Sequence, residues 1–377
     1  MKHYFVSLLF LFALSQTLHS QVSSAEEPVK LSVRGKIKRT GNIFVRFLKQ
    51  FNAIDTAYVE PNYYNYAAML QNTNFYQSYR LRAEDDLLGR QSITFSPTGS
   101  VKIGPYFGWR WIFLGYTFDV GNLSSSGKQS EFSLSLYSSM LGADFVYITN
   151  TGNFKIRKVS GFGHQIDSSI RDIRFNGADT YTASLNVYYV FNHKRFSYPA
   201  AFAQSTVQRK SCGSWMLGLR FDKQRIQFDY ESLPPQLLNE NSSIDNPGLL
   251  DKMKINRIDY KNYSLSGGYA YNWVFARNFL FSVSVAPSIG FKQARGERFK
   301  GESFWLNVKN MNFDFISRFG LVWNNTRWFA GASFINHLYD YRRDRLSLTN
   351  SLNYFNVYFG VNFHKRKEYR KTDEKKW

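Results

Sequence analysis

The stretch Lys102–Gly121, KIGPYFGWRWIFLGYTFDVG, alternates large apolar residues with polar or small ones. Before Gly108 the apolar residues stand mostly at odd positions, and beyond Trp109 they stand at even positions. Alternation with a period of two predicts a β-strand. The change of parity predicts a tight turn between two strands, because pairing across a two-residue turn moves the apolar set to the other parity. A bulge in one long strand is the alternative explanation.

The same pattern recurs along most of the chain and predicts further strands joined by short turns. Counted from a first strand at residues 74–83, the segments number about fourteen, and twelve is the alternative count. Short turns are expected near residues 108, 140, 193, 223, 275 and 325. Long polar loops are expected at residues 83–98, 121–129, 150–179, 204–212, 232–260, 292–310 and 340–351.

Strand length and composition favour a transmembrane antiparallel up-and-down β-barrel, an all-β fold. Many segments run about ten residues, which suits a tilted membrane strand better than the usual globular strand of about five or six. The face opposite the apolar one carries Ser, Asn, Gly, Asp and Arg, which suits a wet lumen. Tryptophans beside the short turns predict an aromatic girdle at the periplasmic side: Trp109, Trp111, Trp273, Trp323 and Trp328. A secreted β-sandwich that binds or adheres is the alternative.

The N-terminus predicts export. Residues 1–20 pair Lys2 with an apolar run from Phe5 to Leu14, which is typical of a signal peptide cleaved after Ser20 or Ala25. The single Cys212 leaves no internal disulfide to stabilise the exported chain. The resulting division is a signal peptide at 1–20, a periplasmic segment at 21–73, a barrel at 74–363 and a basic tail at 364–377. Within the periplasmic segment, the stretch RTGNIFVRFLKQFNAI predicts a short amphipathic helix whose apolar positions run from Ile43 to Phe51.

From Phe51 to about Phe363 the chain resembles an uncharacterised family of Bacteroidetes-type outer-membrane barrels, the domain of unknown function 4421. The resemblance lies in the stretches FNAIDTAYVEPNYYNY, KIGPYFGWRWIFLGYTFD and SLYSSMLGADF. It implies a β-barrel in the outer membrane of a Gram-negative cell and no known activity.

The residues predict no enzyme, cofactor or metal site. Beyond the signal peptide the histidines are His164, His193, His337 and His364, and none belongs to an HExxH motif or a Cys/His ligand pattern. We interpret His337, on the predicted lumen face, as a polar residue with hydrogen-bond partners. A membrane-embedded enzyme remains the weakest of the functional classes.

Charges of both signs occur at positions whose parity predicts the lumen: Lys102, Asp119, Asp144, Arg220, Arg225, Asp229, Asp314 and Arg318. Such charges can line the pore of a small-solute channel and set its ion selectivity. Alternatively they pair across a narrow lumen and rigidify a closed barrel. The first reading predicts a pore, and the second a structural or surface-binding barrel.

Basic clusters fall on predicted external loops: Lys292, Arg295, Arg298, Lys300, Arg342, Arg343 and Arg345. The chain carries a formal net charge of +20, and lipopolysaccharide phosphates are the natural partner for such clusters at the surface of an outer membrane. A solvated loop face is the alternative. An exported barrel is not expected to bind nucleic acid, and the sequence does not predict an oligomeric state.

Overall fold

The computed structural model describes residues 53–109, 112–115, 118–120, 128–238, 248–254, 256–295, 311–343 and 345–370. All of them belong to the unit Gln50–Trp377. The signal peptide predicted at 1–20, the apolar positions Ile43 to Phe51 of the predicted helix, and Trp111 lie outside the described residues. No helix in the described part of the chain is long and apolar enough to cross a membrane.

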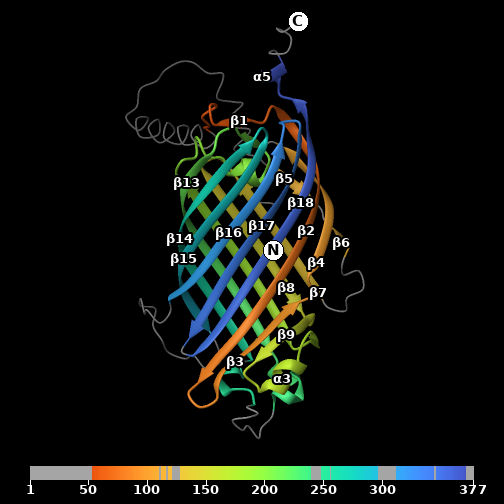
Figure 1. The fold of residues 1–377 in the computed structure, drawn as a ribbon, viewed down its shortest axis with the longest axis vertical. Helices are drawn as coiled ribbons and strands as arrows, with labels where there is room; N and C mark the ends of the chain where they lie inside the picture. Colours follow the sequence, from red (N-terminus) through yellow and green to blue (C-terminus); the bar gives the residue numbers. More distant parts are fainter. Residues whose placement is uncertain are drawn as a thin grey trace, which may run out of the picture. The chain divides into compact units, whose positions relative to one another are not determined.

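One antiparallel sheet dominates the described residues and forms a wall of long, tilted strands (Figure 1). Its members are β2 (Tyr64–Asp85), β3 (Gly89–Pro97), β4 (Ser100–Trp109), β5 (Ile112–Gly115), β6 (Phe118–Asp119), β7 (Lys128–Tyr137), β8 (Leu141–Thr151), β9 (Phe154–Ser160), β10 (Ile173–Phe175), β11 (Ala178–Val190), β13 (Cys212–Phe228), β14 (Arg257–Ala276), β15 (Phe279–Arg295), β16 (Met311–Asn324), β17 (Trp328–Arg343) and β18 (Leu346–Lys365). A separate pair joins β1 (Val59–Pro61) to β12 (Thr206–Gln208). The short helices are α3 (His164–Ser169), α4 (Tyr198–Phe202) and α5 (Lys367–Arg370), with 3-10 turns at Tyr230–Ser232, Pro235–Leu237 and Asp251–Met253.

The prediction of an all-β, up-and-down antiparallel fold is confirmed. From β13 to β18 each strand pairs with the next strand of the chain, and β18 also pairs with β2, so the first and last wall strands lie side by side. Some consecutive strands are two parts of one longer strand with a break between them. β3 and β4 both pair with β2, one after the other, and in the same way β10 pairs with β9 and β11 pairs with β8. β8 and β9 lie near opposite ends of the pairing order, yet only Gly152 and Asn153 separate them along the chain.

The two faces of the wall have the reverse of a soluble protein's burial pattern. On β14 the outward residues include Tyr263, Leu265 and Trp273, each about half exposed, whereas the inward Ser264 and Asn272 are buried. Apolar groups normally avoid water and polar groups normally seek it. The alternation therefore places an apolar surface outside and a polar lining inside.

The hairpin predicted around residues 222–224 is wrong, because β13 runs unbroken through Asp222 and pairs along its whole length with β14. The physical reason is a change in the interior. Near the short turns the apolar residues of β13, such as Leu217 and Leu219, face outward, but Ile226 and Phe228 face inward into an apolar core. The parity of apolar residues thus flips along one strand without any turn.

Other predicted loops also prove to be strand. β2 begins at Tyr64 rather than at residue 74, β3 occupies most of the loop predicted at 83–98, and the loop predicted at 340–351 shrinks to the connection between Arg343 and Leu346. The loop predicted at 150–179 contains β9, α3 and β10. The wall therefore extends further toward the long-loop end, where β3 and α3 lie in Figure 1, than the apolar pattern indicated.

The connection between β11 and β13 differs most from its prediction. Residues 191–211 were expected to hold a short turn near 193 and an external loop at 204–212. They form instead one connection at the end of the wall that carries the short turns. Within it, α4 begins after Ser197, whose hydroxyl accepts a hydrogen bond from the Ala200 amide at 3.2 Å. Tyr198, Ala200 and Ala201 are buried.

The adjacent glycines Gly267 and Gly268 on β14 give a matched test of the two faces. A Cβ on Gly268 would lie against the backbone carbonyl of Val285, whereas a Cβ on Gly267 would meet no atom within 4 Å. Gly268→Ala should therefore lower the free energy of unfolding by about 1–3 kcal/mol through overpacking. Gly267→Ala should leave it unchanged or raise it slightly. Urea unfolding of the refolded protein measures both, and equal effects would contradict the assigned register.

Candidate functional site

A buried ion pair joins two wall strands that are not neighbours. Arg318 on β16 donates from Nη2 to Asp144 Oδ2 on β8 at 2.5 Å, and both side chains are almost inaccessible to water. Asp144 also accepts hydrogen bonds from Ser135 Oγ at 2.8 Å and from Asn186 Nδ2 at 3.2 Å. The Arg318 guanidinium lies over the ring of Tyr188, 5.3 Å from its centroid. The pair therefore spans the interior and has polar partners on several strands.

A second network centres on Asp314 of β16. Its Oδ2 accepts from Arg220 Nη2 at 2.7 Å and from Asn262 Nδ2 at 2.8 Å, and its Oδ1 accepts from the Asp340 amide at 3.0 Å. Lys292 Nζ lies 3.7 Å from the same carboxylate. Arg220 also pairs with Asp222 at 3.0 Å. These contacts connect β13, β14, β15, β16 and β17 on their inward face.

The connection at residues 191–211 packs against inward-facing residues of the wall at the short-turn end. Tyr198 Oη of α4 lies 2.6 Å from the inward Ser284 Oγ, and Gln204 Nε2 donates to Tyr358 Oη at 2.7 Å. At the other end, Leu237, Leu249 and Met253 of the β13–β14 connection pack into the apolar core between the strands. Described residues thus lie inside the wall at three levels: the connection with α4 at the short-turn end, the ion network in the middle, and the apolar core at the long-loop end.

The structure places the predicted lumen charges as follows. Asp144, Arg220, Asp314 and Arg318 lie buried inside, Lys102 lies inside against Glu131 at 2.6 Å, and Asp119 lies across from Lys102 on β6. Arg225 and Asp229 are corrections. Because β13 has no turn, Arg225 faces outward and pairs with Asp259 at 2.7 Å, and Asp229 is exposed beyond the strand.

The histidines take up different positions. His337 is buried on β17 and His193 lies in the β11–β13 connection, whereas His164 in α3 and His364 on β18 are exposed. The described residues contain no cluster of three His, Cys, Asp or Glu side chains with metal-binding geometry.

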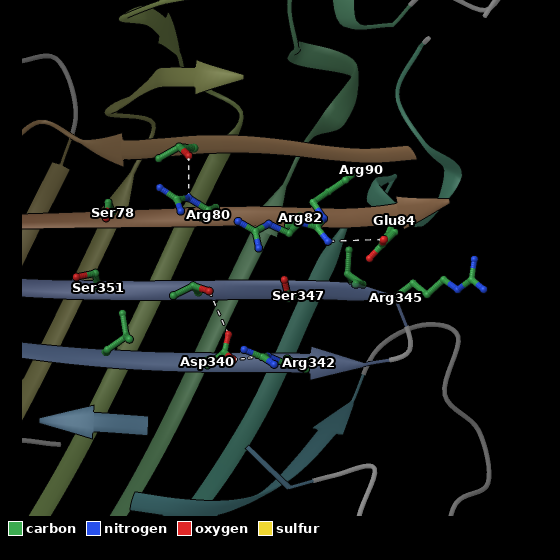
Figure 2. Close-up of a pocket in the computed structure, with 14 residues that line it drawn as sticks. Ser78, Arg80, Arg82, Glu84, Arg90, Asp340, Arg342, Arg345, Ser347 and Ser351 are labelled. Carbon is green, nitrogen blue, oxygen red and sulfur yellow. Dashed lines mark hydrogen bonds and ion pairs between the residues drawn. The ribbon is translucent and has the colours of Figure 1, made fainter. Parts of the chain in front are cut away.

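The outer face of β2, β3, β17 and β18 carries a polar cleft at the long-loop end (Figure 2). Its volume is about 590 Å³. The residues that line it are Ser78, Arg80, Arg82, Glu84, Arg90, Thr94, Leu338, Asp340, Arg342, Arg345, Leu346, Ser347, Thr349 and Ser351.

The arginines of this cleft differ in their partners. Arg342 pairs with Asp340 at 2.5 Å, and Arg90 lies 3.7 Å from Glu84. Arg345 pairs with Asp86, and this hydrogen-bonded carboxylate raises the pKa of Arg345. Arg80 and Arg82 have no carboxylate partner among the residues that the structure describes.

The side chains of Arg80 and Arg82 are bordered by hydroxyl groups instead. Arg80 Nε donates a long hydrogen bond of 3.4 Å to Thr94 Oγ1. Arg82 Nε is buried and has no hydrogen-bond partner within the described part of the chain. The cleft therefore holds two guanidinium groups whose charge no neighbouring carboxylate offsets.

The predicted external basic residues divide into several groups. Lys292 is a correction, because it lies on β15 with its side chain buried in the interior and donates to the Asp340 carbonyl. Arg342 faces outward in the cleft, and Arg345 lies in the exposed turn beside it. β15 ends at Arg295 and β17 ends at Arg343. Arg298 and Lys300 lie outside the described residues.

Sequence reasoning missed three features of these sites. Asp222 was taken as part of a turn, α4 was not predicted, and Arg80 and Arg82 were counted only as part of the first strand. The stretch YRLRA does contain the signal for the cleft, because apolar Tyr79 and Leu81 alternate with the two arginines. Nothing in the sequence indicates that α4 lies between the strands.

The comparisons with known proteins give a family but no activity. The family model described as Domain of unknown function (DUF4421) matches residues 53–363. No curated protein matches the chain. Among solved structures, the outer membrane protease OmpT from Escherichia coli is similar at 9% identity, with 79% of this chain and 97% of that chain covered and a TM-score of 0.37.

Two further solved structures are similar at lower scores. The Pseudomonas putida toluene transporter TodX shares 8% identity, with 78% of this chain and 89% of that chain covered and a TM-score of 0.24. The outer membrane protein OprG from Pseudomonas aeruginosa shares 9% identity over 81% of this chain and 98% of its own, with a TM-score of 0.22. We transfer no function from these structures.

Removing the carboxylate at the centre of the buried network should be costly. Asp314→Asn would remove the carboxylate that Arg220 and Lys292 share and leave Arg220 with Asp222 alone, and breaking a buried pair costs about 3–5 kcal/mol. Asp172→Asn is the control, because Asp172 forms an exposed pair with Arg157 at 2.5 Å and such pairs contribute about 0–1 kcal/mol. Urea unfolding compares the two variants, and a cost below 1 kcal/mol for Asp314→Asn would contradict the assigned role.

Proposed function

The chain belongs to this family of unknown function, and we propose that it is an integral outer-membrane β-barrel with a sealed interior, which acts as a surface scaffold and not as a channel. The observation that carries the proposal is the filled interior between an apolar outer face and the polar lining. The proposal includes no catalytic activity, since the interior carboxylates Asp144, Asp222 and Asp314 are each engaged by arginines.

The outer face supports insertion into a membrane. A membrane barrel presents an outward apolar band roughly 25 Å tall with aromatic girdles at its edges. On β13 the outward residues Trp215, Leu217, Leu219 and Phe221 are exposed and apolar, and Lys223 marks the end of this apolar run. Trp109, Trp273 and Trp328 are also exposed near the short turns, where the periplasmic girdle was predicted. A soluble β-sandwich would bury this face against a second sheet.

Burial of the interior charges supports a sealed barrel. An open aqueous lumen would leave its lining side chains accessible to water, as in porins. The side chains of Arg220 and Asp314 are instead 1% and 0% exposed, and Arg318 is 2% exposed. These side chains therefore have almost no contact with water, which supports an interior without an open aqueous path.

Merging the interrupted strands favours the lower of the two predicted strand counts. β3 with β4, β5 with β6, β8 with β9 and β10 with β11 each follow one course along the wall. We therefore propose twelve wall strands that close into a barrel, with both termini and the short turns in the periplasm. The β5–β6 edge and the edge of β7 meet in the proposed closure.

Conductance tests the seal. Reconstituted into a planar bilayer, the protein should show no stepwise openings, because the ion network and α4 fill the interior. A general porin reconstituted at the same protein-to-lipid ratio is the positive control, and heat-modifiable mobility verifies that the protein is folded. Reproducible discrete openings of the folded protein would overturn the sealed scaffold and restore the channel.

A matched pair on the outward face of β13 tests the membrane band. Leu219 is 67% exposed within the apolar run, whereas Gln227 faces outward on the same strand beyond it. Leu219→Arg should lower stability by about 2–4 kcal/mol if this position lies near the bilayer midplane, and Gln227→Arg should cost about 0–1 kcal/mol. The folded fraction in lipid vesicles measures both. Equal tolerance would contradict membrane insertion.

A further inference from the structure

We propose that the outer-wall cleft around Arg80 and Arg82 binds the phosphate groups of a lipid headgroup in the outer leaflet. The proposal rests on the placement of the outward apolar face in a membrane. It does not depend on whether the interior conducts. The site lies on the lipid-facing side of β2, β17 and β18, so its ligand approaches from within the membrane plane and not through the lumen (Figure 2).

Strand register surrounds both arginines with hydroxyl groups. Arg80 lies opposite Thr349 on β18 and Thr94 on β3, and Arg82 lies opposite Ser347 and Ser92 on the same two strands. Side chains directly opposite on antiparallel strands stand about 4.5–5.5 Å apart at Cβ. Guanidinium groups form bidentate hydrogen bonds with phosphate, and hydroxyls add further donors. Thr349 Oγ1 already donates to Asp340 Oδ1 at 3.1 Å, so Thr94, Ser92 and Ser347 supply the remaining hydroxyls.

Charge across the cleft favours an anion. Among the described residues that line it, the arginines are Arg80, Arg82, Arg90, Arg342 and Arg345, and the carboxylates are Glu84 and Asp340. The two carboxylates already pair with Arg90 and Arg342. The unpaired charge is therefore concentrated on Arg80 and Arg82, and the partly buried guanidinium of Arg82 has an Nε without a hydrogen-bond partner in the described part of the chain.

The height of the cleft matches the headgroup layer. On the outward face of β18 the exposed Phe359, Val357 and Phe355 are followed by Asn353 and then by Ser351 at the lower end of the cleft. At roughly 3.3 Å per residue and a tilt of about 40°, Ser351, Thr349 and Ser347 stand roughly 5, 10 and 15 Å beyond Asn353 toward the long-loop end, and Arg80 and Arg82 lie opposite the last two. The headgroup region beyond the hydrocarbon core is roughly 5 to 8 Å thick on each side. The cleft therefore begins in the headgroup layer at Ser351 and extends outward from that layer to Arg80 and Arg82.

Size and lining favour a lipid headgroup over a free phosphate ion. A cleft of about 590 Å³ falls within the range of roughly 300–1,000 Å³ that accommodates drug-sized ligands. Leu338 and Leu346 add apolar surface at its edges. These features suit a phosphorylated sugar headgroup whose acyl chains lie along the apolar wall below.

The test compares two double variants that lose the same charge at the same end of the wall. Arg80→Gln with Arg82→Gln removes the proposed ligands. Arg225→Gln with Arg257→Gln is the control, because both of these arginines pair with Asp259, at 2.7 and 2.6 Å, outside the cleft. The full-length protein, refolded in non-ionic detergent, is titrated with a diphosphorylated disaccharide glycolipid and with its dephosphorylated form. Native mass spectrometry counts the bound lipid, and heat-modifiable mobility restricts the comparison to folded protein.

The phosphorylated lipid should bind, and its affinity should fall about tenfold or more in the cleft variant, since charge-assisted hydrogen bonds are lost. The control should stay within about twofold of the unsubstituted protein. Equal loss in both variants, or equal binding of the dephosphorylated lipid, would overturn the site. Competition by inorganic pyrophosphate at the lipid's own concentration would overturn the assignment to a lipid. If the unsubstituted protein is folded and non-conducting but does not bind the phosphorylated lipid, the cleft alone is refuted. If it conducts but still binds the lipid, the sealed interior alone is refuted.

Discussion

The structure depends on one constraint: polar groups turned away from water must find partners on other strands. Alternation along each strand places Asp144, Asp314 and Arg318 on the inward face, where burying an unpaired charge would have a large cost in free energy. Each therefore pairs with strands on other parts of the wall, and the pairing fixes which residues face one another. A slip of one residue in any of these strands would expose the charges to the apolar side and break the network at once. The buried ion pairs thus both fix the register of the strands and occupy the interior between them.

The same alternation also creates the outer cleft. Tyr79 and Leu81 must face inward because they belong to the apolar core at the long-loop end, and this places Arg80 and Arg82 on the outside. A surface feature is therefore determined by the packing behind it. Along β18 the outward residues change from Phe and Val to Asn, Ser and Thr while the inward set stays well buried, so the outer face varies with height independently of the interior.

Much of the wall could be predicted from the sequence, because a period of two over ten residues has few explanations. The inward positions of Asp144, Arg220, Asp314 and Arg318 follow from that period alone. The false hairpin at Asp222 shows the limit. Parity reports which face is apolar, and the inner face of β13 changes from polar to apolar along its length, which imitates a turn. Local sequence pattern does not encode where a strand segment lies along the wall or how α4 packs, because both depend on contacts between residues distant in sequence. Lys292 was misplaced for the same reason, because β15 extends further than its apolar pattern.

The two-residue interruption at Gly152 and Asn153 has a consequence for the girth of the wall. On the short-turn side of the interruption β8 pairs with β7, so that β5, β6 and β7 stand between β4 and β8. On the long-loop side β9 pairs directly with β3. A single chain run thus has different neighbours at different heights, and Gly152, with φ 61°, takes the left-handed conformation at the change. The wall therefore contains fewer strands side by side toward the long-loop end. The additional strands β5, β6 and β7 widen the short-turn end, which accommodates a folded segment of the chain, while the end with fewer strands holds a compact apolar core.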